Sequence, residues 1–338
     1  MEHHQAPLSH EEVTGFSDLF NRVQAELGRV VLGSEDLIHG VLVALFAGGH
    51  VLLEGPPGIG KTLLARSVSR VLGVEFKRIQ FTPDLMPSDV TGGNIFNQAE
   101  DAFVFRPGPV FTQVMLADEI NRAPAKTQAS LLEAMSDNQV TVDGETRPLP
   151  EPFFVLATQN PIESEGTYPL PEAQLDRFMV KLLVGHPAHE VELQLLKHTL
   201  GGFDASDLDA AGLARLLDDQ QINAMREMAR RVRVDEGVLD YITALVGRTR
   251  GHPAVDLGAS PRASIALVRT TQVQALAEGR DFVVPDDVKA LAYPVLRHRF
   301  LLQPDAELEG TRHGDVIRQV LQDVPVPGGE QAAEDASE

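Results

Sequence analysis

The sequence predicts an α/β protein, in which a three-layer αβα core with a five-stranded parallel sheet is followed by an all-α domain. Three observations support this fold class. Short apolar runs alternate with amphipathic helical segments through the first 185 residues, which is typical of a parallel sheet covered on both faces. One of these runs leads into a glycine-rich phosphate-binding pattern. After residue 185 the helical periodicity continues, whereas strong strand-like runs stop.

Composition places the chain among soluble globular proteins. Its 338 residues are enough for two domains. No apolar run reaches the roughly 18 residues that a membrane-spanning helix requires, and the N-terminus lacks the basic and apolar segments of a secretory signal. The absence of cysteine excludes disulfides and thiolate metal sites, so we expect a cytoplasmic protein.

The charge balance argues against a nucleic-acid partner. The chain has 49 Asp and Glu residues against 29 Lys and Arg residues, which gives a formal net charge of −20. A surface of that charge repels a polyphosphate backbone unless the basic residues gather on one face. We therefore expect the protein to bind no nucleic acid.

Two helices are expected before the first strand. Ser9 and Glu12 form a capping-box pattern, and the apolar residues after them recur at helical spacing, so a helix is predicted over about 10–28. Ser34 is placed to cap a second helix. The first strand then runs over 50–54.

A phosphate-binding loop directly follows this strand. Its residues fit the pattern G-x-x-x-x-G-K-[ST]; they are Gly55, Pro56, Pro57, Gly58, Ile59, Gly60, Lys61 and Thr62. Glycines allow backbone N–H groups to turn inward around a phosphate, and the helix that begins near Lys61 points its positive dipole end at the same anion. Lys61 adds a point charge and Thr62 a hydroxyl for Mg²⁺. The pattern therefore predicts binding of ATP with Mg²⁺, with Leu63 included in the nucleotide-binding set; an ordinary glycine turn does not explain the lysine and threonine.

The stretch from 82 to 112 is the least regular part of the first domain. It follows a second strand predicted over 74–81 and contains four prolines and a Gly-Gly pair. Short apolar runs at 94–96 and 102–105 indicate a helix interrupted by a β-hairpin. A plain surface loop fits the pattern equally well, although a structureless loop of this length is unusual.

A buried strand over 114–117 ends in two carboxylates. Asp118 is placed to hold Mg²⁺ through water, and Glu119 is placed to orient and deprotonate an attacking water. An apolar run that ends in Asp-Glu is common by chance. Downstream of a phosphate-binding loop, however, it predicts the catalytic half of an ATPase site.

Further strands complete the predicted sheet. A hairpin is expected over 140–146 through an Asp-Gly turn, followed by a buried strand over 153–158 and a last strand over 179–184. Asn160 would lie beside Glu119 if the two preceding strands are neighbours, and its amide would then bind the water or the γ-phosphate. Formation of a simple strand-end turn is the alternative role of Asn160.

The second domain, over 186–324, is predicted to be helical, with helices around 188–200, 210–230, 235–249, 261–278 and 285–296. Ser260 is a suitable N-cap and Pro261 a suitable first helical residue, which leaves Arg262 at a helix N-terminus. A solvated surface charge is the plainer explanation of Arg262. The acidic tail over 325–338 is expected to be disordered.

Together these motifs resemble the AAA+ class of P-loop NTPases, and three strings resemble the MoxR family in its helix-2-insert clade. The strings are LADEINRA at 116–123, ATQNP at 157–161 and LPEAQLDRF at 170–178. The resemblance covers about residues 10 to 322. It implies a nucleotide-binding core over 1–185, with a helix-2 insert hairpin at about 92–106 and a second hairpin at about 139–147.

The same resemblance implies roles for three residues outside the phosphate-binding loop. Asn160 would be sensor 1, Arg177 the arginine finger that serves a neighbouring subunit, and Arg262 sensor 2. A γ-phosphoryl group in transfer needs positive charge beyond Lys61 and Mg²⁺, which agrees with an arginine supplied by a neighbour. Arg122 is a second candidate for that finger. The adenine is expected against the lid and a short turn, whose residues are Val30, Val31 and Gly33.

For function, the resemblance implies a homo-oligomeric ring, expected to be a hexamer, that hydrolyses ATP for chaperone-like remodelling of client proteins. The work would be client maturation or metal-cofactor insertion, often with a partner that carries a von Willebrand factor A domain. Three alternatives remain: the motor subunit of a magnesium-chelatase-type enzyme, a nucleic-acid-processing motor, and a nucleotide-dependent scaffold that barely hydrolyses ATP. The predicted hairpin disfavours the nucleic-acid motor because residues 92–105 include two acidic and no basic residues. The complete set of catalytic residue types disfavours the scaffold.

Overall fold

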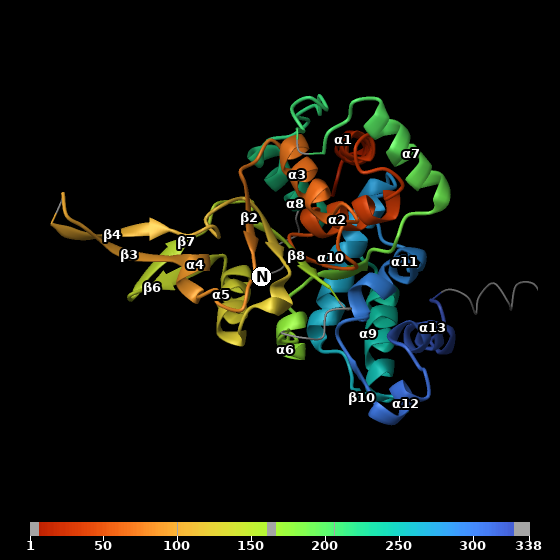
Figure 1. Ribbon diagram of the computed structural model, residues 1–338. Helices are drawn as coiled ribbons and strands as arrows, with labels where there is room; N and C mark the ends of the chain where they lie inside the picture. Colours follow the sequence, from red (N-terminus) through yellow and green to blue (C-terminus); the bar gives the residue numbers. More distant parts are fainter. Residues whose placement is uncertain (1–6, 100, 161–166, 206, 328–338) are drawn as a thin grey trace, which may run out of the picture. The chain divides into compact units, whose positions relative to one another are not determined.

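The computed structural model describes residues 7–99, 101–160, 167–205 and 207–327 (Figure 1). Contacts divide the chain into two compact units. The core unit comprises Asn21–Phe178 and Leu182–Ala224; the C-terminal unit comprises the chain up to Phe20, Met179–Lys181 and the chain from Met225 onward. The domain boundary near residue 185 stays a prediction.

The predicted five-stranded parallel sheet is present, with four strands in the core unit and the fifth, β9, divided between the two units. Its strands lie in the order β2-β5-β8-β1-β9. Their bounds are β1 Val51–Glu54, β2 Phe76–Gln80, β5 Val114–Asp118, β8 Phe154–Gln159 and β9 Val180–Leu183. Strand β5 pairs in parallel with β2 and β8, and β8 pairs in parallel with β1. Since parallel neighbours require crossover connections, helices are brought over both faces of the sheet.

The central strands are buried on both faces, which explains their continuous apolar runs. Met115 of β5 belongs to a core cluster with Leu131 of α5 (Ala125–Asp137). The next residue, Leu116, is also fully buried, and α3 (Lys61–Leu72) packs against β5. Helices α3 and α5 therefore form the outer layers on opposite faces (Figure 1).

Two β-hairpins project side by side from the core unit (Figure 1). The first joins β3 (Gly92–Asn97) to β4 (Ala102–Pro107) and follows α4 (Pro87–Thr91); the second joins β6 (Gln139–Val142) to β7 (Glu145–Pro148). Asn94 Nδ2 donates to Asp143 Oδ2 at 2.6 Å, and the Arg147 guanidinium lies 4.2 Å from the centre of the Phe105 ring. The 82–112 stretch is therefore a short helix and a hairpin, not a plain loop.

The remaining elements of the core unit include one correction. Their bounds are α2 Glu35–Phe46, the 3₁₀ turn η1 Ile120–Arg122, α6 Glu172–Leu175 and α7 His189–Leu200; α8, Asp219–Arg230, is shared by the two units. The helix predicted over 210–230 begins only at Asp219, because Leu216 N–H donates to the Val71 carbonyl at 2.8 Å instead of to a helical partner. Ser34 precedes α2, but its hydroxyl donates to the Leu32 carbonyl rather than capping the helix.

The C-terminal unit is mainly helical and begins with the first half of α1 (His10–Gly28), whose predicted capping box is present. Ser9 N–H donates to Glu12 at 2.8 Å, and Glu12 N–H donates to Ser9 Oγ at 3.2 Å. The later helices are α9 Glu236–Arg250, α10 Pro261–Ala277, α11 Pro285–Leu296, α12 Pro304–Leu308 and α13 His313–Asp323.

One small sheet in this unit was not predicted from the sequence. Strands β10 (Val255–Leu257) and β11 (Leu301–Leu302) pair antiparallel, but strands of two or three residues carry no readable periodicity. The two last helices, α12 and α13, were also not predicted.

Within the described ranges, no helix is long and apolar enough to cross a membrane. Most of the tail predicted to be disordered lies outside the described residues.

Candidate functional site

The phosphate-binding loop connects β1 to α3, as its sequence predicts. Gly58 and Gly60 have φ values of +80° and +82°, a conformation that glycine adopts without steric cost. Gly55 is needed for a different reason, since a Cβ there would lie 2.2 Å from the Val184 carbonyl oxygen. Helix α3 begins at Lys61, so its N-terminal N–H groups lie at the loop.

The Lys61 ammonium is held by the loop itself. Its Nζ donates to the Gly55 carbonyl at 2.6 Å and to the Pro56 carbonyl at 3.1 Å. Burial lowers the pKa of Lys61, while the nearby carboxylates of Asp118 and Glu119 act in the opposite direction. A phosphate would therefore meet a partly desolvated cation that exchanges carbonyl partners for an anion.

A cavity of about 370 Å³ opens beside this loop. It is lined by Pro57, Gly58, Gly60, Lys61, Thr62, Arg78, Gln80, Asp118, Glu119 and Asn160. Strands β5 and β8 are neighbours, so the residues at and after their carboxyl ends converge as the sequence predicted. The structure thus brings the predicted lysine, threonine, both carboxylates and the asparagine together in one cavity of ligand-binding size.

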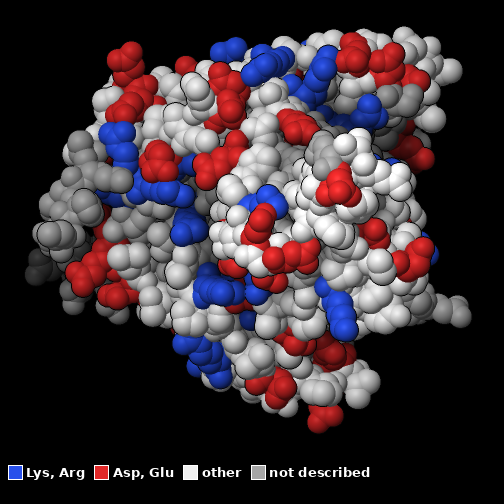
Figure 2. All heavy atoms as spheres, turned by 90° about the vertical axis from the view of Figure 1, so that its left-hand side faces the viewer, with Lys and Arg blue, Asp and Glu red and all other residues white. Residues whose placement is uncertain are grey.

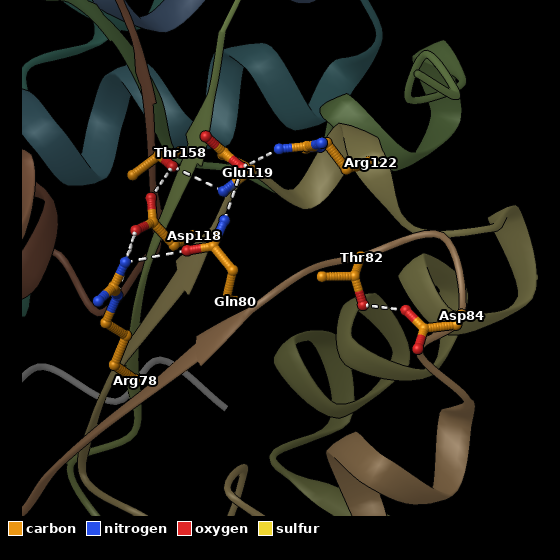
Figure 3. Close-up of polar contacts among 8 residues, drawn as sticks. All are labelled: Arg78, Gln80, Thr82, Asp84, Asp118, Glu119, Arg122 and Thr158. Atoms are coloured by element: carbon orange, nitrogen blue, oxygen red, sulfur yellow. Dashed lines mark hydrogen bonds and ion pairs between the residues drawn. The ribbon is translucent and has the colours of Figure 1, made fainter. Parts of the chain in front are cut away.

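Asp118 ends β5 with both carboxylate oxygens engaged (Figure 3). Its Oδ1 accepts from Thr158 Oγ1 at 2.6 Å. Its Oδ2 accepts from Arg78 Nη2 at 2.7 Å and from Arg78 Nε at 3.2 Å. The carboxylate is therefore fixed by one neighbouring strand on each side, because Thr158 belongs to β8 and Arg78 to β2.

Glu119 is held in an unusual backbone conformation and by two donors (Figure 3). Its φ of +55° lies in the left-handed region, which costs a non-glycine residue about 1 kcal/mol or more. Its N–H donates to Thr158 Oγ1 at 2.8 Å. Its Oε2 accepts from Gln80 Nε2 at 2.6 Å and from Arg122 Nη1 at 3.0 Å. The strained turn aims this side chain into the cavity beside Asp118.

Sequence reasoning missed Arg78 and Gln80, which line the cavity from β2. The sequence contained a usable signal, because Arg78 and Gln80 stand on either side of Ile79. Residues two apart in a strand point to the same face, so these two polar side chains share one face of β2. The loop after β2 is fixed separately by Thr82 Oγ1, which donates to Asp84 Oδ1 at 2.6 Å. That hydrogen bond is the main cause of a lowered pKa at Asp84.

The donor set fits a magnesium ion bound together with phosphates. Within the described parts of the chain, no group of three or more His, Asp or Glu side chains is placed to hold a metal. The cavity instead offers the Thr62 hydroxyl and the Asp118 carboxylate. Mg²⁺ prefers such a site, because it takes most of its ligands from substrate phosphates and water.

The three arginines proposed as arginine finger or sensor 2 lie in three different environments. Arg177 Nη1 donates to the Leu132 carbonyl of α5 at 2.8 Å and also to the Ser136 hydroxyl. Arg122 pairs with Glu119 in its own chain. Arg262 is exposed near the start of α10 in the C-terminal unit, where its N–H donates to Ser260 Oγ at 3.2 Å, as the predicted N-cap requires.

The turn proposed to contact adenine is well defined. Val30 and Val31 are 3% and 7% exposed. Gly33 has a φ of +61°, and a Cβ at this position would lie 2.4 Å from the side chain of Val191. A close packing contact with α7 therefore explains this glycine, independently of any ligand.

Comparisons with known proteins agree with this geometry. The model of the ATPase family associated with various cellular activities (AAA) matches residues 50–180, and an AAA lid domain model matches residues 247–320. The chain is 47% identical to the protein YeaC of Bacillus subtilis, covering 91% of this chain and 95% of YeaC. It is 40% identical to chaperone MoxR1 of Mycobacterium tuberculosis, covering 96% and 88%, and 32% identical to protein MoxR of Methylorubrum extorquens, covering 93% and 97%.

A solved structure is also similar. It belongs to a candidate ATPase from Cytophaga hutchinsonii, and the TM-score is 0.86 at 39% identity. The match covers 94% of this chain and 97% of that one. The similarity therefore extends over the phosphate-binding loop, the carboxylate strand and the helical C-terminal region alike.

Proposed function

Because this chain belongs to the MoxR family of AAA ATPases, we propose that it hydrolyses ATP to ADP and phosphate and uses the reaction for chaperone-like remodelling of client proteins. The observation that carries the proposal is the convergence of Lys61, Asp118 and Glu119 in one cavity. The name of the Mycobacterium relative, a chaperone, supports the class of work.

The cavity residues divide the chemistry among them. Backbone N–H groups of the loop and the Lys61 ammonium bind the phosphates. Thr62 and Asp118 would hold Mg²⁺, which supplies charge neutralisation at the phosphate oxygens. Glu119 orients the attacking water and removes its proton, and Asn160 holds that water or the γ-phosphate.

The catalytic carboxylate has to change partners before it acts as a base. Its Oε2 atom accepts hydrogen bonds from both Gln80 and Arg122. Both donors point at the oxygen that would accept the proton of the attacking water, so they have to move away before Oε2 can serve as the base. We therefore assign the arrangement seen here to a resting site.

Assembly into a ring, with six copies, is part of the proposal. Arg177 binds α5 in its own chain and is not among the residues that line the cavity, so its finger role requires a neighbouring subunit. Arg262 would act as sensor 2 from the C-terminal unit, and the turn at Val30 and Val31 would contact the adenine. A partner with a von Willebrand factor A domain and the metal-insertion role rest on the family resemblance.

Surface features favour a protein client over a nucleic acid. On the face shown in Figure 2, basic and acidic side chains are interspersed. The β3–β4 hairpin exposes apolar side chains, with Phe96 51% and Phe103 73% exposed, and Arg106 near its base is its one basic residue. A magnesium-chelatase-type motor remains the alternative, because it would use the same site chemistry.

The test of the ATPase proposal is Glu119→Gln. We expect this variant to bind ATP as the parent protein does and to hydrolyse it more slowly by about 10² or more, the usual weight of general-base assistance. Phosphate release and binding of a fluorescent ATP analogue measure the two quantities separately. Hydrolysis close to the parent rate would exclude Glu119 as the base, and proteins that copurify with this variant in ATP would identify the client.

A further inference from the structure

The Asp118 carboxylate, which the proposed metal site requires, is occupied by a cation from the protein itself. Arg78 places two nitrogens on Oδ2, at 2.7 and 3.2 Å. Thr158 donates to the other oxygen at 2.6 Å. Neither carboxylate oxygen is therefore without a strong donor in this state (Figure 3).

The pairing of β2 with β5 places Arg78 close to Asp118. In the β2–β5 register, Arg78 lies opposite Leu116 and Gln80 lies opposite Asp118. Arg78 and Gln80 are two residues apart, so they share one face of β2. Arg78 Nη2 also donates to Gln80 Oε1 at 2.9 Å, and the guanidinium is thereby fixed between two acceptors.

Burial of the Asp118 carboxylate makes its ion pair with Arg78 important for stability. The Asp118 side chain is 13% exposed, and the Arg78 side chain is 47% exposed. A largely buried carboxylate without a counter-ion is costly, so Asp118 is stabilised by whichever cation is present. The Arg78 guanidinium and a hydrated divalent metal would therefore compete for the same Asp118 oxygen.

We propose that Arg78 is a positioning residue that occupies the metal position in the resting site, and that it leaves Asp118 when a metal–nucleotide complex binds. The affinity of the protein–nucleotide complex for metal is then set by competition with Arg78. The inference rests on the proposed function, because it assumes that nucleotide and metal bind in this cavity. On this inference, the metal affinity of the site is lower than it would be without Arg78, because the metal has to displace the guanidinium from Asp118.

The test measures metal affinity instead of turnover. Full-length protein saturated with ADP is titrated with Mn²⁺, and free Mn²⁺ is determined by electron paramagnetic resonance. ADP is chosen because it is not hydrolysed and has no γ-phosphate that Arg78 could contact. Arg78→Gln removes the competing charge, and we expect it to tighten Mn²⁺ binding by about two- to fivefold, the scale of a partly exposed ion pair.

The chain offers a matched control. Arg248 contacts Asp323 Oδ2 through Nη2 at 2.8 Å and through Nε at 3.2 Å, and its side chain is 50% exposed. This pair in the C-terminal unit has nearly the same geometry as the Arg78–Asp118 pair. Arg248→Gln should leave Mn²⁺ affinity unchanged, and Arg78→Lys, which keeps a cation, should lie between the parent and Arg78→Gln.

The outcomes separate the inference from the proposed function. Unchanged or weaker Mn²⁺ binding in Arg78→Gln, or equal tightening in Arg248→Gln, overturns the inference. If the unaltered protein shows no Mn²⁺-dependent binding of fluorescent ADP, the proposed function fails as well. Circular dichroism checks the fold of each variant; if Arg78→Gln is unfolded, Arg78→Met, which keeps the aliphatic stem, is judged by the same criterion.

Discussion

At the scale of single residues, the polar side chains of the candidate site already have protein partners. Lys61 binds two loop carbonyls, Asp118 binds Arg78 and Thr158, and Glu119 binds Gln80. Such contacts keep buried charges in place when no ligand is present. On the proposed function, nucleotide and metal binding would exchange these partners for ligand groups, and the hydrogen bonds lost would offset part of those gained.

Lys61→Ala tests this view of the loop. We expect nucleotide affinity to fall by about two orders of magnitude, since a hydrogen bond to a charged group contributes about 1.5–3 kcal/mol. Binding of a fluorescent ATP analogue measures the effect. Lys289→Ala is the control, because Lys289 is paired with Asp286 in the C-terminal unit. An affinity of Lys61→Ala within about twofold of the parent would contradict the assigned role.

At the scale of elements, short-range signals determine where helices begin and turns form. Asp143 and Gly144 have φ values of +52° and +83°, as the predicted Asp-Gly turn of the second hairpin requires. Gly73 ends α3 with a φ of +63°. Helix α1 begins with its capping box, and Glu12 also binds Arg231 at 2.6 Å. One carboxylate thus caps α1 and joins it to a distant part of the same unit.

Acid should weaken this junction. The Arg231 hydrogen bond first, and then the Ser9 N–H, lower the pKa of Glu12 from 4.5 to about 2. A carboxyl group whose pKa is lowered by folding contributes stability that is fully present above the unfolded value of 4.5 and is lost as the pH falls toward about 2. We therefore expect Glu12→Gln to lower the Tm by a few degrees at pH 7 and by progressively less at lower pH.

Thermal unfolding followed by circular dichroism between pH 7 and about 3 measures this difference. Glu11→Gln changes an exposed neighbour on the same helical turn and serves as the control. A Tm difference between Glu12→Gln and the parent that stays constant over this pH range would show that the ion pair does not contribute.

At the scale of the whole molecule, the chain contributes to each unit more than once. Phe16 and Phe20 of α1 stack in the C-terminal unit with ring centres 6.2 Å apart, while the second half of α1, residues 21–28, belongs to the core unit. The proposed ring adds a further level, because Arg177 is held by α5 of its own chain. On that proposal, each catalytic site is complete only when a second copy supplies the arginine.

Mixed subunits test the proposed ring. Arg177→Ala alone should bind ATP normally but hydrolyse it more slowly by about 10³, if it acts as a full finger. Mixed with Lys61→Ala subunits, it should regain activity, because an intact phosphate-binding loop then meets an intact arginine at some interfaces. Activity equal to the sum of the separate preparations, with subunit exchange confirmed by mass, would instead favour Arg122 or a site within one chain.

The sequence by itself determined the features that depend on neighbouring residues. The phosphate-binding loop, the Ser9–Glu12 capping box and the strand ending in Asp118 are recognisable because their chemistry lies within a few positions. The parallel sheet also followed from local patterns, since buried strands alternate with helices. Asn160 was expected near Glu119 only if their strands were neighbours, and the pairing of β5 with β8 in the structure meets that condition.

Only the tertiary structure decided which distant side chains meet. Arg78 and Asp118 contact each other because β2 and β5 are neighbours in one register, and neither strand order nor register is written in local periodicity. The same holds for Arg177, which donates to the Leu132 carbonyl of α5, and for Leu216, whose hydrogen bond to Val71 prevents the helix expected there. It also holds for the two short strands β10 and β11. In each case a long-range hydrogen bond, made possible by packing, overrides or supplements what the local sequence favours.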